Sequence, residues 1–184
     1  MSSIVSSWLG RWWVCITFGV ISTIIFGYLV PNAVAVVTEN RTLAPRILDE
    51  YYLTWTAADA RPFFTALGAS GREAYQNYYL TLDFWFPVLS LTVFYTALLS
   101  LAFPAGHRWA WLNLLPLIMY ALDMVENINH FSMAGSYPDL PVWQLQVGPI
   151  LTLAKYVLIT ALPILALIGF WIKRKSVPAH ETAS

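Results

Sequence analysis

The sequence predicts an all-α integral membrane protein, a bundle of four transmembrane helices that forms one domain over residues 1–184. Hydrophobic residues make up 58% of the chain and charged residues only 11%, whereas soluble domains carry about 25% charged residues. Four apolar segments each reach the length of about 20 residues that a bilayer-spanning helix needs. The formal net charge of zero gives no indication of a nucleic-acid partner.

The four predicted spans follow from the apolar runs and from the residues that interrupt them. The first span, about 12–30, contains no charged residue, and we expect Pro31 to end it. The second, about 78–103, contains Asp83 as its one charged residue. The third and fourth, about 109–131 and 148–172, carry Asp123, Glu126 and Lys155. Each span is otherwise apolar enough to lie in hydrocarbon.

Basic residues predict that both termini lie in the cytoplasm. Arg11 precedes the first span, Arg108 lies between the second and third, and a Lys-Arg-Lys run at 173–175 follows the fourth. Cytoplasmic loops carry an excess of Lys and Arg. The connection between the third and fourth spans has neither. We therefore expect a multi-pass protein of the plasma membrane or the endoplasmic reticulum.

The segment 38–77 is predicted to be a partly helical extracytoplasmic segment between the first two spans. Pro45 can open a short helix. Thr56 or Asp59 can cap a second helix that ends near Gly68. These helices would lie over the outer end of the bundle.

Four ionisable side chains lie inside the predicted spans: Asp83, Asp123, Glu126 and Lys155. A charge at the bilayer centre costs roughly 3 to more than 10 kcal/mol, so such residues usually face the bundle interior and mark functional sites. A rise of about 1.5 Å per residue places Asp83, Asp123 and Lys155 each roughly 10 Å below the outer end of its span. We expect one shared pocket toward the outer leaflet.

Helix phase places further polar side chains beside these charges. At about 100° per residue, Asn127 and His130 share an arc with Asp123 and Glu126, and Tyr120 lies just beyond it. Tyr79 shares a face with Asp83 in the same way. The candidate substrate-binding residues are therefore Asn127, Lys155, His130, Tyr79 and Tyr120. One histidine is a weak donor set, so neither a metal nor another cofactor is predicted.

The chain resembles a family of small four-span integral membrane proteins that has a D-x-x-E-N motif in its third span and no assigned activity. The resemblance covers residues 54–172 and is carried by Thr56-x-x-Asp59-Ala60, Leu67-Gly68-x-x-Gly71-Arg72-x-x-Tyr75, Asp83 with Phe86-Pro87, Leu114-Leu115-Pro116, Asp123-x-x-Glu126-Asn127 and Thr152-x-x-Lys155. It implies that Arg72 and Tyr75 also belong with the charged cluster, as further substrate-binding residues.

These features predict a pocket that binds a membrane lipid or another lipophilic small molecule. Asp83, Asp123 and Glu126 are the candidate catalytic residues, since neighbouring carboxyl groups can exchange protons with a substrate. If the protein is an enzyme, isomerisation or cyclisation by acid–base chemistry fits best, because the sequence has no nucleophile or redox-cofactor motif. The alternative is a non-enzymatic accessory or assembly subunit whose charges pair with one another or with a membrane-protein partner.

Overall fold

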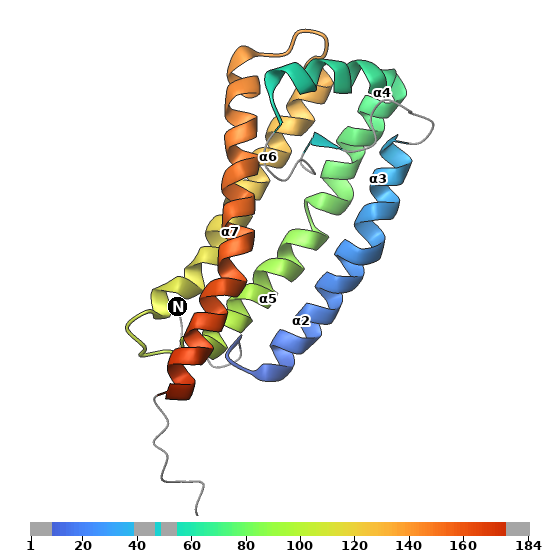
Figure 1. Cartoon of the computed structure of the whole chain (residues 1–184). Coiled ribbons are helices and arrows are strands. Elements are labelled where there is room, and N and C mark those ends of the chain that lie inside the picture. Colours follow the sequence, from blue (N-terminus) through green and yellow to red (C-terminus); the bar gives the residue numbers. More distant parts are fainter. Residues whose placement is uncertain (1–8, 39–46, 49–54, 176–184) are drawn as a thin grey trace, which may run out of the picture.

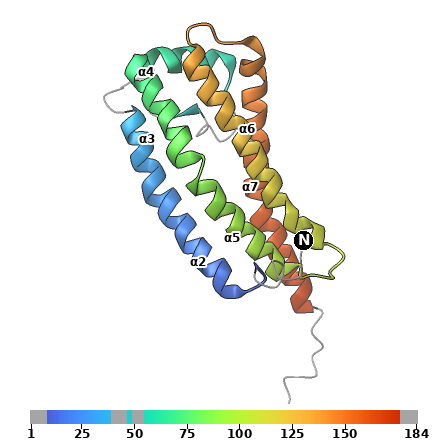
Figure 2. The same ribbon diagram turned by 180° about the vertical axis from the view of Figure 1, so that it is seen from behind.

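The computed structural model describes residues 9–38, 47–48 and 55–175, and within these ranges the chain is all-α, without strands. The described helices form four long rods that lie side by side (Figures 1 and 2). In chain order the rods are α2 (Trp12–Ile24), the π-helical turn η1 (Ile25–Leu29) and α3 (Val30–Thr38); α4 (Ala57–Tyr78), the π-helical turn η3 (Tyr79–Asp83) and α5 (Phe86–Ala102); the 3₁₀ turn η4 (Ala110–Leu114) and α6 (Leu115–Ser136); and α7 (Val142–Lys175). The predicted all-α class is confirmed.

Two stretches of the described residues are long and apolar enough to cross a membrane, namely Trp12–Ala35 and Val142–Lys175. In the second rod the helix is interrupted after Asp83, so its apolar part is the shorter stretch Leu89–Ala102. The third rod carries two acids, Asp123 and Glu126, within α6. Both features explain why these two rods contain no long candidate span, because a membrane-spanning helix is recognised by an uninterrupted stretch of about 20 apolar residues.

The first rod does not end at Pro31, which the sequence analysis expected to terminate the helix. The helical path continues to Thr38 through η1. In this turn the Val30 N–H donates to the oxygen of Ile25, five residues back. A proline has no N–H and its ring crowds the preceding turn, so a widened π turn just before it lets the helix continue.

The first half of α4 lies across one end of the bundle, above α6 and α7 (Figure 1). Its start is a capping box, in which the Thr56 N–H donates to Asp59 Oδ2 at 2.7 Å. The helix bends at Gly68, whose φ of 63° suits a residue without a side chain. The predicted cap and the predicted end of this helix are therefore confirmed. The short helix expected from Pro45 lies outside the described residues.

Apolar cores lie on both sides of a buried polar layer. One core surrounds Trp55, Phe64 and Met133, next to the first half of α4. The other surrounds Leu99 and Leu162, where α5, α6 and α7 pack together. Between them, α6 and α7 carry the buried polar and charged residues from 123 to 130 and from 152 to 155. Large apolar side chains cover much of the outside of the rods instead.

Candidate functional site

The side chain of Lys155 joins α6 to α7 through two ion pairs. Its Nζ lies 3.0 Å from Asp123 Oδ1, and it also pairs with Glu126 Oε2. Asp123 and Glu126 are three residues apart and therefore lie on one face of α6. All three side chains are buried. The structure thus brings together three of the four ionisable residues that the sequence analysis placed at one depth.

Glu126 lies at the most protected point of this group, since none of its surface is exposed. Thr152 Oγ1, one turn before Lys155 on α7, donates a hydrogen bond to Glu126 Oε1. The Trp55 indole Nε1 in turn donates to Thr152 Oγ1 at 3.0 Å. A Cβ atom on Gly148 would collide with the Trp55 ring, so this glycine lets the indole approach α7 closely. Glu126 is therefore held on two sides.

Asp83 reaches the same layer from the second rod. It is the last residue of η3, and Tyr78 Oη donates to its Oδ1 at 3.1 Å. The Asn127 amide nitrogen lies 3.5 Å from the Asp83 carbonyl oxygen and 3.5 Å from Asp123 Oδ2. Asn127 therefore links the second rod to the Asp123–Lys155 pair. The fourth predicted ionisable residue thus joins the layer, next to the ion pairs.

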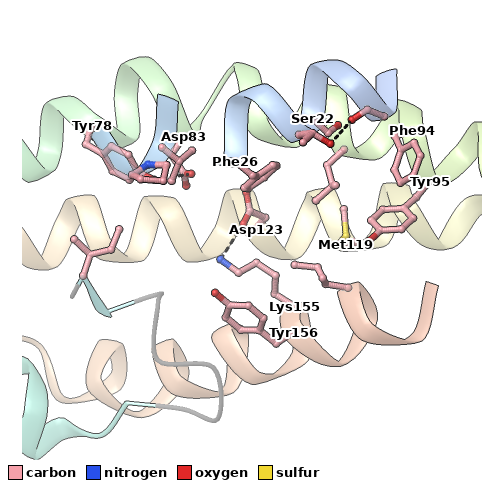
Figure 3. A pocket seen from close by; sticks show the side chains of 17 residues that line it. Ser22, Phe26, Tyr78, Asp83, Phe94, Tyr95, Met119, Asp123, Lys155 and Tyr156 are labelled. Carbon is pink, nitrogen blue, oxygen red and sulfur yellow. Dashed lines mark hydrogen bonds and ion pairs between the residues drawn. The ribbon is translucent and has the colours of Figure 1, made fainter. Parts of the chain in front are cut away.

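A cavity of about 710 Å³ opens beside this layer. Asp83, Asp123 and Lys155 border it at the charged end, together with Tyr78 and Tyr156 (Figure 3). Away from the charges its wall is largely apolar and contains Phe94, Tyr95 and Met119 (Figure 3). Leu91 and Ile159 also line the cavity. The cavity therefore joins a strongly polar end to an apolar body, which suits an amphiphilic molecule.

The first rod forms one wall of the cavity with Ser22, Phe26 and their neighbours. This rod carries no charged residue within the membrane span expected from the sequence. Helix α2 packs along α5, and Tyr156 of α7 borders the cavity together with it. The first rod thus contributes both to packing and to the wall.

His130, Tyr79 and Tyr75 form a separate buried group that does not border the cavity. Tyr79 Oη lies 2.9 Å from His130 Nδ1 and donates to Tyr75 Oη at 3.0 Å. Trp55 packs against the His130 ring at a centroid distance of 5.6 Å. These three predicted substrate-binding residues therefore lie among the aromatic side chains near α4. Trp55, which also donates to Thr152, connects this group to the charged layer.

Two other predicted binding residues lie apart from the layer. Arg72 Nη1 donates to the Phe64 oxygen at 3.0 Å, and its guanidinium lies over the Tyr137 ring at 4.5 Å. These contacts hold the bend of α4 and do not reach the carboxyl groups. Tyr120 is partly exposed and does not border the cavity. The resemblance implied that Arg72 belongs with the charged cluster, whereas the structure places it at the bend of α4.

Within the described residues, no group of three or more His, Cys, Asp or Glu side chains is arranged to hold a metal ion. The Lys155 ammonium group occupies the position between Asp123 and Glu126 where a bound cation would sit. It supplies the positive charge that the two carboxylates need.

Comparison with known proteins adds no relationship, because no protein-family model, curated protein or solved structure matches the chain. The geometry of the charged layer and of the cavity is therefore the basis for assigning a function.

Proposed function

We propose that the chain is a four-span membrane protein whose cavity binds a lipophilic small molecule or lipid. The membrane assignment is supported by where the side chains lie. Charged residues are buried between the rods, whereas large apolar residues such as Ile150, Val157 and Leu167 are exposed on α7. This distribution is unfavourable in water and favourable in lipid. It extends over α6, where Leu117, Val125 and Ile128 are exposed.

The observation that carries the binding proposal is the cavity itself. Its charged end contains Asp83, Asp123 and Lys155, and its body is lined mainly by aromatic and aliphatic side chains. Ligand sites in proteins combine a mostly apolar wall with a few polar groups that orient the ligand. We place the polar group of the ligand at Asp83 and its apolar part along Phe94 and Met119.

Acid–base chemistry is the catalytic form of this proposal. Asp83 and Asp123 both border the cavity, so each is placed to reach a bound molecule. An ionised carboxylate would remove a proton from one carbon of the substrate, and a protonated carboxyl would return a proton at another. The result is an isomerisation. A cyclisation follows instead if protonation of one alkene carbon leaves its neighbour cationic, a second double bond of the substrate attacks that neighbour, and a carboxylate then removes a proton. Glu126 lies behind Lys155 and acts by holding it.

The cavity can be tested with a photoreactive long-chain alcohol incorporated into lipid nanodiscs with the protein. We expect cross-links to side chains of the cavity wall, such as Tyr95 and Met119. Ser22→Phe would place a ring in the cavity and lower this labelling severalfold. Val20→Phe is the matched control, because Val20 lies on the same helix and is exposed. Labelling confined to the outer surface, and equal in the two variants, would contradict the proposal.

The second candidate function is that of an accessory or assembly subunit of a membrane complex. It is favoured by the close pairing of Lys155 with two carboxylates, because such pairs also serve to fix how helices assemble. Purification from native membranes in a mild detergent distinguishes the two functions. A stoichiometric membrane-protein partner together with an unlabelled cavity would favour the subunit.

A further inference from the structure

The charged end of the cavity contains more acidic than basic groups. Asp83 and Asp123 border it, Glu126 lies directly behind, and Lys155 is the one buried Lys or Arg among the described residues. The Lys155 ammonium already lies between Asp123 and Glu126. An anionic ligand group would therefore be repelled by the nearby carboxylates, since the Lys155 ammonium is already paired with two of them. A cationic ligand group would be attracted.

Hydrogen-bonding capacity is also left over in the cavity wall. Asp83 is only 7% exposed, and its Oδ2 has no hydrogen-bond partner among the described residues. Ser22, on the first rod, is 6% exposed, and its Oγ is likewise without a partner there. Both residues border the cavity (Figure 3). Because buried polar atoms are nearly always paired, the unpaired carboxyl oxygen of Asp83 favours a ligand group that can donate a hydrogen bond.

Aromatic rings complete the surroundings of this end. Phe26, Tyr78 and Tyr156 border the cavity from three different rods. Lys155 Nζ lies 5.6 Å from the centre of the Tyr156 ring, so one cation already lies over an aromatic face here. Aromatic faces attract cations most strongly where water is excluded.

Building on the proposed function, we infer that the ligand of this cavity is a cationic amphiphile, a lipophilic molecule with a protonated amine. The ammonium group donates to the carboxyl of Asp83, at the acidic end of the cavity. The hydrocarbon part lies along Leu91, Phe94 and Met119. Charge, the unpaired carboxyl oxygen and the ring faces all favour the same ligand group.

Three probes with the same saturated chain test the inference: dodecylamine, dodecanol and dodecanoate. Each competes with the photoreactive alcohol in nanodiscs at about pH 8, where a free amine is cationic and a free carboxyl is anionic. Mole fractions in the lipid are matched, so that partitioning into the membrane does not affect the ranking. We expect dodecylamine to compete about tenfold better than dodecanol, as a charge-assisted hydrogen bond allows, and dodecanoate to be weakest.

The variant Asp83→Asn removes the charge and keeps an acceptor for Tyr78, and it should reduce the advantage of the amine over the alcohol. Glu73→Gln is the matched control, since Glu73 is an exposed acid on α4. Equal competition by amine and alcohol, or stronger competition by dodecanoate, overturns the inference and leaves the proposed cavity standing. Failure of the alcohol to label the cavity overturns both. The ranking in the unaltered chain decides the matter even if Asp83→Asn does not fold.

Discussion

The Trp55 indole Nε1 donates a hydrogen bond of 3.0 Å to Thr152 Oγ1, although the two residues are 97 positions apart in the chain. Thr152 Oγ1 in turn donates a hydrogen bond to Glu126, which pairs with Lys155. The residue just before the capped start of α4 is therefore connected to the ion pairs inside the bundle. Buried hydrogen bonds of this kind fix how two elements sit against each other.

Replacing Trp55 by Phe should lower the stability of the protein by about 1 kcal/mol, because Thr152 loses the donor while the ring is largely retained. The measurement is thermal unfolding in one detergent. Trp143→Phe is the control, since Trp143 is 60% exposed. Equal changes in the melting temperature of the two variants would contradict a structural role for this hydrogen bond.

Replacing Lys155 by Met should destabilise the protein by about 3–5 kcal/mol, because Asp123 and Glu126 would remain buried without their cation. Adding Asp123→Asn and Glu126→Gln to the same chain should recover much of this loss, since the three charges are then removed together. Expression level and thermal unfolding measure both effects. A triple variant no more stable than Lys155→Met would show that charge balance is not the cause.

Asp123→Asn and Glu126→Gln should have different effects, although each removes one ion pair of Lys155. Asp123 borders the cavity, whereas Glu126 is fully buried behind it. We therefore expect Asp123→Asn to weaken ligand competition severalfold, and Glu126→Gln to lower the melting temperature more than ligand binding. The two readouts come from the nanodisc competition and from thermal unfolding. The reverse pattern would assign Glu126 to direct ligand contact.

Gly148→Ala should destabilise the protein by about 1–3 kcal/mol, because the added methyl group collides with the Trp55 ring and lies 2.7 Å from Asn129 Nδ2. Gly27→Ala is the matched control, since a Cβ there meets no other atom within 4 Å. The control should leave the melting temperature unchanged or slightly higher, as Ala favours a helix more than Gly does. A loss of similar size at both positions would point to a general helix effect.

The proposed four-span topology can be tested with single cysteines and a membrane-impermeant maleimide. In a Cys15→Ser background, Asp139→Cys lies in the exposed connection between α6 and α7, and Ala105→Cys in the exposed connection before η4. We expect Asp139→Cys to react from outside intact cells and Ala105→Cys to react only after the membrane is permeabilised. Labelling of both from the same side would exclude four spans.

Much of the charged layer could be predicted from helix geometry alone. Asp123, Glu126 and Asn127 share a face of α6 because residues three and four apart are neighbours on any α-helix. Lys155 and Asp83 reach the same layer because the rise per residue sets their depth. The capping box at Thr56 and the bend at Gly68 were also predictable, since each depends on residues that are adjacent in the chain.

Other features depend on which rods are neighbours and how each is rotated. Hydrophobic pattern and helix periodicity act locally, so the all-α class, the apolar rods and the residues that must be buried could be predicted from the sequence. The folded structure was needed to show that Trp55 reaches Thr152, that Arg72 stays at the bend of α4, and that the first rod borders a cavity with Ser22. The physical reason is that such contacts join residues far apart in the chain, and the π turns at η1 and η3 shift the helix phase on which a sequence-based estimate relies.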